Sequence, residues 1–316
     1  MSRPLTRTGR LFMLALALAL PASLAEWQVG RAYERAYFAE RIAYQRHLPA
    51  PDAGAALHDL LGYDLDAVRR GAPVPRKFLA SLPKDLDRVS DTAERKRLFF
   101  AGILPLILRV NELISEDRTR LLALETKVGS GQGLNDWERR WLATLAAHYG
   151  LAPRQGAEET DFARLEHRVD IIPPSLALAQ AAIESGWGRS RFAREGNALY
   201  GQWTWDDGDD GIVPARRGDG MTHRIRAFPF LIDSVGAYAD NLNRNPAYRA
   251  FRRVRSALRR GGGPLRGIDL VQTLRAYSER RDAYVAELKA IIAANDLGDF
   301  DNARLAPPRP ARLALN

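Results

Sequence analysis

The stretch that most constrains this chain is an apolar helix that ends in a carboxylate followed by glycines. From Pro174 onward, apolar residues recur at three- and four-residue spacing up to Ile183, which is the pattern of a helix with one apolar face. Proline suits the first turn of such a helix, and Gly186 and Gly188 end it. The pattern therefore places Glu184 in the last helical turn.

The position of Glu184 favours the neutral form of its carboxyl group. A carboxylate at a helix C-terminus faces the negative end of the helix dipole, and Trp187 can exclude water from it, so its pKa should rise. A carboxylic acid that stays protonated near neutral pH can donate the proton that glycosidic bond cleavage requires. The alternative is structural, with Glu184 forming a helix-end salt bridge to Arg189 or Arg191.

Polar and aromatic residues around Glu184 suggest a carbohydrate site. Aromatic faces suit stacking on sugar rings, and the glycines would allow a ligand to come close. Each aromatic residue could equally belong to the core. Gln180 lies one helical turn before Glu184. The candidate substrate-binding residues are Gln180, Trp187, Tyr200, Trp203, Trp205 and Tyr284.

Composition narrows the chemistry further. The 316 residues carry a formal net charge of +9, which suggests an anionic partner, and they include no cysteine. Disulfides, thiolate zinc sites and a thiol nucleophile are therefore excluded. The five histidines are scattered without metal-ligand spacing, so we expect neither a metal nor another cofactor. No nucleic-acid-binding motif is present, and nucleic acid is not an expected partner.

The N-terminus has the features of a secretory signal peptide. Arg3, Arg7 and Arg10 precede the apolar run Leu11–Leu20, and small residues follow before Glu26. We expect residues 1–25 to be a signal peptide and the mature protein to be exported. An uncleaved signal that anchors the protein in the inner membrane is the alternative. The next most apolar window, residues 98–114, is interrupted by a proline and an arginine.

The remaining pattern predicts a mainly α fold of the α+β class with a small β-hairpin lobe. Residues 26–155 read as a helical region, with expected helices at 26–47, 55–61, 93–127 and 136–149, the last of them capped by Asn135. A polar segment then precedes a second unit at 156–300, in which residues 201–228 form the extended hairpin. Residues 301–316 are expected to be a disordered, basic, proline-rich tail.

Three ordered blocks of sequence resemble one known family. "LALAQAAIESGWGRSRFAREGNALYGQW", "FPFLIDSVGAYADNLNRNPAY" and "LRAYSERRDAYVAELKAIIAAND" are similar to the bacterial cell-wall N-acetylglucosaminidases of glycoside hydrolase family seventy-three. "VPRKFL" and "FFAGILPLILRVNELI" resemble the extra N-terminal part of the Bax-type members. The resemblance implies a lysozyme-like fold, a periplasmic location and cleavage of the β-1,4 bond after N-acetylglucosamine in peptidoglycan. A muramidase or lytic transglycosylase on the same fold, or a non-catalytic peptidoglycan-binding protein, is the alternative.

The resemblance also assigns roles to single residues. Glu184 matches the general acid of the family, Tyr277 matches an active-site aromatic, and Tyr284 matches the tyrosine before the last helix. Tyr284 is also in phase with Leu288 on one helix face, which favours a core role instead.

A second catalytic carboxylate is not evident from the sequence. Relatives often carry a glutamate in the hairpin, whereas this chain has only aspartates there, and these also suit a solvated turn. The acetamido group of the substrate could replace the second acid. The candidate second carboxylates are Asp206, Asp207, Asp209, Asp210, Asp219 and Glu195.

An arginine-rich segment, Tyr248–Arg260, is the candidate contact with anionic envelope polymer. Its apolar residues fall on one helix face and most of its arginines on the other, although a merely solvated face gives the same pattern. The arginines expected to make this contact are Arg252, Arg253, Arg255, Arg259 and Arg260.

Overall fold

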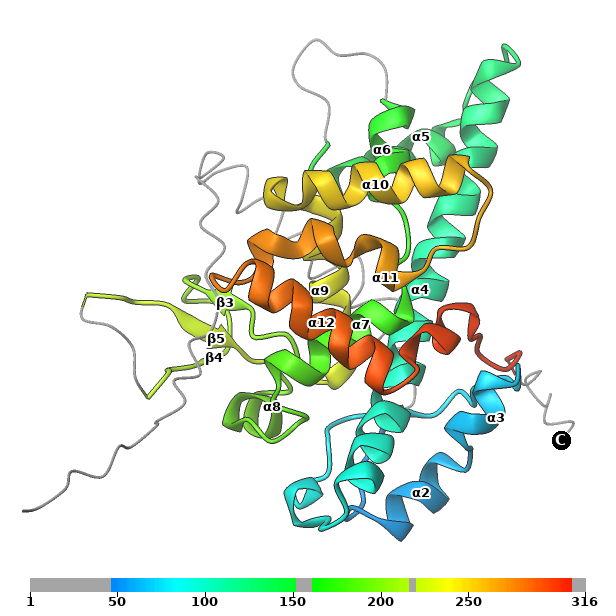
Figure 1. The fold of residues 1–316 in the computed structure, drawn as a ribbon. Helices are drawn as coiled ribbons and strands as arrows, with labels where there is room; N and C mark the ends of the chain where they lie inside the picture. The colour runs from blue at the N-terminus through cyan, green and yellow to red at the C-terminus, as the bar shows by residue number, and fades with distance from the viewer. Residues whose placement is uncertain (1–46, 152–160, 216–219, 309–316) are drawn as a thin grey trace, which may run out of the picture.

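The computed structural model describes residues 47–151, 161–215 and 220–308, and Figure 1 shows a mainly helical molecule with a small sheet at one side. The mainly α fold class with a small β lobe is thereby confirmed. Several predicted features lie outside the described residues, namely the signal peptide, nearly all of the predicted helix 26–47, Asp219 and the end of the tail.

The N-terminal region is built around one long helix. The helices of this region are α2 (Ala55–Leu61), α3 (Leu65–Arg69), η1 (Leu86–Arg88), α4 (Thr92–Gly129) and α5 (Asp136–His148). Asn135 caps α5 as predicted, because its side chain accepts from the Glu138 amide in a capping box. By length and composition α4 could cross a membrane, but 83% of its most apolar window is buried inside the protein, where it serves as a core helix.

Pro105 lies inside α4 and does not end it. A proline removes one helical hydrogen bond and crowds the preceding turn. The residues from Leu98 to Leu108 are nevertheless all buried, so the hydrophobic free energy of this segment opposes that loss.

The second half of the chain forms shorter helices around a central one. Its helices are α6 (Phe162–Arg168), α7 (Pro174–Glu184), α8 (Arg191–Gly196), α9 (Leu231–Arg244), η2 (Pro246–Tyr248), α10 (Arg249–Arg260), α11 (Gly267–Leu270), η3 (Val271–Tyr277), α12 (Asp282–Ala294) and η4 (Leu297–Asn302). Helix α7 packs against α4, α11, α12 and η4 (Figure 1). A single hydrophobic cluster extends from Leu57 to Phe300, so both halves of the chain share one core.

The predicted hairpin is a three-stranded antiparallel sheet. Its central strand is β5 (Arg224–Arg226), flanked by β3 (Trp203–Thr204) and β4 (Gly211–Ile212). Ile225 lies opposite both Trp203 and Ile212, which fixes the register. A second, parallel pair joins β1 (His47–Leu48) to β2 (Phe78–Leu79) in the N-terminal region.

Residues 301–306 belong to the folded unit, contrary to the predicted disordered tail. Asp301 accepts hydrogen bonds from the Ser175 amide and hydroxyl and from the Gly267 amide, each at 2.8 Å. Beyond it, Leu305 forms a parallel bridge with Val74. The proline-rich composition suggested disorder, but these pairings satisfy the backbone that follows η4.

Side chains of the N-terminal region pack closely around Gly188, and a substitution at this glycine tests that packing. Its φ is +74°, and an added Cβ would lie 2.7 Å from Leu82 Cδ1 and 3.2 Å from Phe99 Cδ2. We expect Gly188→Ala to lower the free energy of unfolding by about 2 to 5 kcal/mol, from backbone strain plus overlap. Urea unfolding provides the measurement.

Gly186→Ala is the matched control for that variant. Gly186 has a φ of +58° but nothing within 4 Å of an added Cβ, so it should lose only about 1 to 2 kcal/mol of backbone strain. Equal losses for the two variants would contradict the close packing of Gly188.

Candidate active site

The end of α7 is closed by a Schellman motif that places Glu184 in the final turn. The Trp187 amide donates to the Ala182 carbonyl at 2.8 Å, and the Gly186 amide donates to the Ile183 carbonyl at 3.2 Å. Ser185, which is buried, adds a hydroxyl that accepts from the Gly188 amide at 2.8 Å. The positive φ at Gly186 is the conformation that this motif requires.

Trp187 anchors this turn to the N-terminal region. Its φ is +61°, and its ring packs edge-on against Phe100 and Phe99, with centroids 5.3 and 6.0 Å away. Lys96 Nζ lies 4.7 Å from the centre of the same ring. The structure therefore places Trp187 against α4. The groups that face Glu184 are tyrosines instead.

The carboxyl of Glu184 has a pKa well above its ordinary value. Burial raises its pKa to about 7, a hydrogen bond from Tyr284 and the charge of Arg280 lower it in part, and the charge of Glu287 raises it. The Tyr284 hydroxyl donates to Oε1 at 2.8 Å. The residue is partly exposed, so the group combines a low-dielectric environment with access from solvent.

The predicted alternative, a helix-end salt bridge, is not formed. Arg189 Nε donates to the Gly186 carbonyl at 3.1 Å, and Arg191 Nη2 donates to the Val213 carbonyl at 2.7 Å. Within the described part of the chain, no arginine or lysine forms an ion pair with Glu184. The carboxylate therefore has no ion pair with a described residue, and the more distant charge of Arg280 offsets only part of the effect of burial on its pKa.

Gln180 lies beneath Tyr284 in a chain of hydrogen bonds. Its Nε2 donates to the Tyr284 hydroxyl at 2.9 Å, and its Oε1 accepts from the Tyr238 hydroxyl at 2.7 Å. Gln180, Tyr238 and Tyr284 are all buried. Gln180 was expected to bind substrate, but the structure places its amide between two tyrosines.

Five tyrosines form a cluster beside Glu184, which we call the tyrosine cluster. Tyr284 stacks parallel to Tyr277 with centroids 5.8 Å apart, and Tyr200 stacks on Tyr238 at 3.9 Å. Tyr248 tilts against Tyr277. Tyr200 is 2% exposed, so its ring cannot serve as the sugar platform expected from the sequence, and it is a core residue. The cluster consists of Tyr200, Tyr238, Tyr248, Tyr277 and Tyr284.

The other two candidate aromatics lie in the β lobe. Trp203 stacks on His223 with centroids 3.5 Å apart, and Trp205 tilts against both rings. Trp205 is 53% exposed, which leaves its ring open to a ligand. Trp203 is half-buried under this stack.

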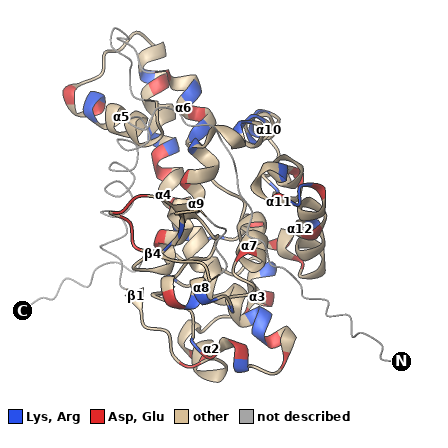
Figure 2. Ribbon diagram, turned by 90° about the vertical axis from the view of Figure 1, so that its left-hand side faces the viewer, with Lys and Arg blue, Asp and Glu red and all other residues tan. Residues whose placement is uncertain are grey.

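Most candidate second carboxylates are engaged in the lobe or on α8. Asp209 is buried, accepts from the Thr204 hydroxyl at 2.6 Å and lies 3.6 Å from Arg226. Asp206 accepts from the Gly208 amide within the acidic turn before β4, which is red in Figure 2. Asp207 pairs with Arg224 at 3.7 Å.

Glu195 and Asp210 complete the described candidates. Glu195 faces Arg191 at 3.9 Å across one turn of α8. Asp210 is exposed, and its carboxylate forms no ion pair with a described residue. Asp210 is therefore the described candidate whose carboxylate is least committed to a structural contact.

The arginine-rich helix α10 has a different arrangement from the one predicted. Arg255 and Arg252 are buried, and their guanidinium groups donate to backbone carbonyls, including those of Asp170 and Leu242. Arg259 pairs with the buried Asp170 at 2.7 Å. The helical pattern could not reveal these acceptors, because they lie outside α10, and Asp170 is 85 residues before Arg255. Among the predicted contacts, the arginines that remain exposed without an ion pair to a described residue are Arg253 and Arg260.

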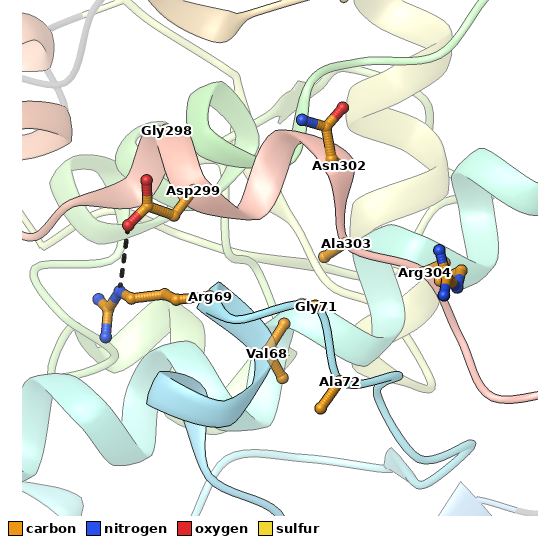
Figure 3. Close-up of a pocket in the computed structure, with 9 residues that line it drawn as sticks. All are labelled: Val68, Arg69, Gly71, Ala72, Gly298, Asp299, Asn302, Ala303 and Arg304. Carbon is orange, nitrogen blue, oxygen red and sulfur yellow. Dashed lines mark ion pairs between the residues drawn. The ribbon is translucent and has the colours of Figure 1, made fainter.

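The cavity drawn in Figure 3 lies away from Glu184. It has a volume of about 280 Å³ between α3 and η4, and Arg69 and Asp299 face each other across it at 3.9 Å. None of its lining residues belongs to the Glu184 site or to the tyrosine cluster. The described residues also include no group of three or more His, Asp or Glu side chains able to hold a metal ion.

Comparison with known proteins places these features in a family. The profile of the glucosaminidase family, described as mannosyl-glycoprotein endo-β-N-acetylglucosaminidase, matches residues 159–297. Protein bax of Escherichia coli K12 is 31% identical over 208 residues, which cover 65% of this chain and 71% of that protein. The chain belongs to the glucosaminidase family, as a Bax-type member.

A second relative covers less of the chain. Peptidoglycan hydrolase FlgJ, from Escherichia coli O157:H7 and K12, is 29% identical over 106 residues. These residues cover 30% of this chain and 34% of FlgJ, so the chain spans about a third of that relative's length. No solved structure matches the chain. The matched family range contains Glu184 and all five residues of the tyrosine cluster.

Sequence reasoning missed two residues that organise the site. Tyr238 stands in the second block that resembles the family, and nothing local indicates that its hydroxyl reaches Gln180, 58 residues away. Ser185 was read as part of the motif after Glu184. Its position directly after the helix was a signal for a hydroxyl that caps the turn.

Glu184 should make stability depend on pH. Its folded pKa of about 7 lies above the ordinary value of 4.5, so ionisation costs more in the folded state and stability falls as pH rises between these values. Glu184→Gln removes this cost. We expect the variant to match the native protein at pH about 5 and to melt at a higher temperature at pH about 8.

Thermal melts across this pH range test the prediction, with Glu195→Gln as the control. The Glu195 side chain is 58% exposed, so its replacement should leave the pH dependence as it is in the native protein. If the melting temperatures of the native protein and Glu184→Gln change with pH in the same way, the pKa of Glu184 is not raised in the folded state.

Proposed function

We propose that this protein is a peptidoglycan hydrolase, an endo-β-N-acetylglucosaminidase that cleaves the β-1,4 bond after N-acetylglucosamine. The observation that carries the proposal is Glu184, a partly exposed residue whose carboxyl forms no ion pair with a described cation and has a pKa of about 7. Membership of the glucosaminidase family and the likeness to peptidoglycan hydrolase FlgJ support the choice of substrate.

Glu184 acts as the general acid in this proposal. While the bond between the anomeric carbon and the leaving oxygen breaks, the carboxyl transfers its proton to that oxygen. The resulting carboxylate keeps the hydrogen bond from the Tyr284 hydroxyl at 2.8 Å. A charged product state is thereby stabilised in a site whose burial favours the neutral reactant state.

The engaged aspartates favour a mechanism without a second protein nucleophile. Asp209 is buried against Arg226. Asp207 and Glu195 are exposed and face Arg224 and Arg191 at 3.7 and 3.9 Å. The acetamido oxygen of N-acetylglucosamine can attack the anomeric carbon itself, and water then opens the intermediate. Asp210, or Asp219 outside the described residues, is the remaining candidate for a base that activates water.

The same observation supports one alternative activity. A lytic transglycosylase cuts the other glycosidic bond with a single acid, so it also needs no second carboxylate. The fragments distinguish the two activities, because a glucosaminidase leaves N-acetylglucosamine at the reducing end, whereas a lytic transglycosylase leaves anhydro-muramic acid.

Substrate contacts and location complete the proposal. Tyr277 and Tyr284 are buried beside the acid, so they are not sugar platforms, whereas Trp205, with Trp203 beneath it, offers an exposed ring for a sugar. Arg253 and Arg260 are the exposed cations of α10 for anionic envelope polymer. The signal-like N-terminus and the substrate of FlgJ support a periplasmic location, with the membrane-anchored form as the alternative.

Digestion of purified peptidoglycan tests the proposal directly. We expect the native protein to release soluble fragments with N-acetylglucosamine at their reducing ends. Glu184→Gln keeps the shape of the side chain and removes the transferable proton, so its activity should fall at least about 100-fold. Mass analysis of the fragments and zymogram clearing are the measurements.

The outcomes separate the candidate functions. Anhydro-muramic ends would replace the glucosaminidase assignment with a lytic transglycosylase. Binding to sacculi without release of fragments would indicate a non-catalytic wall-binding protein. Undiminished clearing by folded Glu184→Gln would contradict the assigned acid.

A further inference from the structure

The hydrogen bonds beneath Glu184 run in one direction across three helices. The Tyr238 hydroxyl of α9 donates to Gln180 Oε1 at 2.7 Å, and Gln180 Nε2 of α7 donates to the Tyr284 hydroxyl at 2.9 Å. The Tyr284 hydroxyl of α12 then donates to Glu184 Oε1 at 2.8 Å. We call these four residues the donor chain.

The geometry fixes the direction of this chain. A tyrosine hydroxyl has one proton, so Tyr284 can donate either to Gln180 or to Glu184. If the Gln180 amide were reversed, Tyr284 would donate to Gln180 and would turn an acceptor oxygen toward the Glu184 carboxylate, 2.8 Å away. The hydroxyl of Tyr238 opposes that reversal, because Oε1 is the one described acceptor for its proton, and a reversed amide would leave this buried donor unpaired.

We propose that Gln180 and Tyr238 are positioning residues that act through Tyr284 to keep the acid proton of Glu184 on Oε2. Oε1 accepts the hydrogen bond from the Tyr284 hydroxyl and is the carbonyl oxygen of the protonated acid. Oε2 is then the oxygen that carries the acid proton. No described residue donates a hydrogen bond to Oε2. This inference rests on the proposed function in one respect, because the proposed reaction supplies the leaving oxygen that Oε2 would protonate.

Other charged and titratable groups near Glu184 affect how readily its carboxyl ionises. The donor chain determines which of its two oxygens carries the proton. Arg280, before α12, favours the ionised form, and Glu287 of α12 opposes it. Tyr248 and Tyr277 of the tyrosine cluster interact with the charge from η2 and η3.

Loss of the chain should have two linked effects. Without the Tyr238 donor, the Gln180 amide can reverse, and Tyr284 then no longer donates to the carboxylate. Glu184 would instead donate from Oε1 to Tyr284, which favours the protonated form and holds the proton on the oxygen that cannot transfer it. The carboxyl should therefore titrate at higher pH while kcat falls.

The test is a carboxyl titration by ¹³C NMR on the full chain, with the Glu184 signal assigned from its loss in Glu184→Gln. We expect Tyr238→Phe and Gln180→Met to raise the titration midpoint by about half a pH unit. Tyr284→Phe, which removes the last donor, should raise it at least as far. On peptidoglycan, kcat for Tyr238→Phe should fall about 2- to 10-fold with little change in KM.

Tyr63→Phe is the matched control. Its hydroxyl donates to the Ala101 carbonyl at 2.7 Å in the N-terminal region, so the variant also loses one tyrosine hydrogen bond. It should reduce stability to a similar extent and leave the Glu184 midpoint unchanged. Tyr238→Phe removes a single oxygen, so it decides the question if Gln180→Met fails to fold.

If the Glu184 titration midpoint in both Tyr238→Phe and Gln180→Met equals that of the native protein, the proposal is overturned. The NMR readout does not depend on activity, so the two proposals can fail separately. If the native protein released no fragments but the midpoints shifted, the donor chain would stand and the hydrolase assignment would fall.

Discussion

The structure depends on the burial of α7, whose two ends are held by polar contacts from the last part of the chain. Residues Pro174 to Ala182 are all buried. At the start of α7, Asp301 accepts from the Ser175 amide and hydroxyl, where a helix N-terminus favours a negative charge. At its end, Tyr284 donates to Glu184. The acid is thus fixed by contacts that form only when the C-terminal helices pack on α7.

The N-terminal region belongs to the same physical unit. Leu82, Leu86 and Phe99 surround Gly188 so closely that an added Cβ would overlap, and the ring of Trp187 packs on α4. The turn that ends α7 is therefore held between its own Schellman hydrogen bonds and the N-terminal helices. A region that reads from sequence as a helical spacer supports the backbone next to the acid.

The sequence predicted the elements that depend on local patterns. The start and end of α7, the Asn135 cap and the position of Glu184 follow from helix periodicity and capping residues. The donor chain could not be predicted, because Gln180 and Tyr284 are 104 residues apart. Likewise, Arg255 looked solvent-facing, but the carbonyls that accept from it lie more than 80 residues away. Side-chain partners between distant segments leave no periodic signal.

Two opposing effects determine the protonation state of the Glu184 carboxyl. Burial disfavours its charge, the Tyr284 hydroxyl favours it, and the balance leaves a pKa of about 7. The difference infrared spectrum between native protein and Glu184→Gln at pH about 6 tests this balance most directly. The account predicts that the native spectrum contains the carbonyl band of a protonated carboxyl that the variant lacks. A difference confined to carboxylate bands would contradict it.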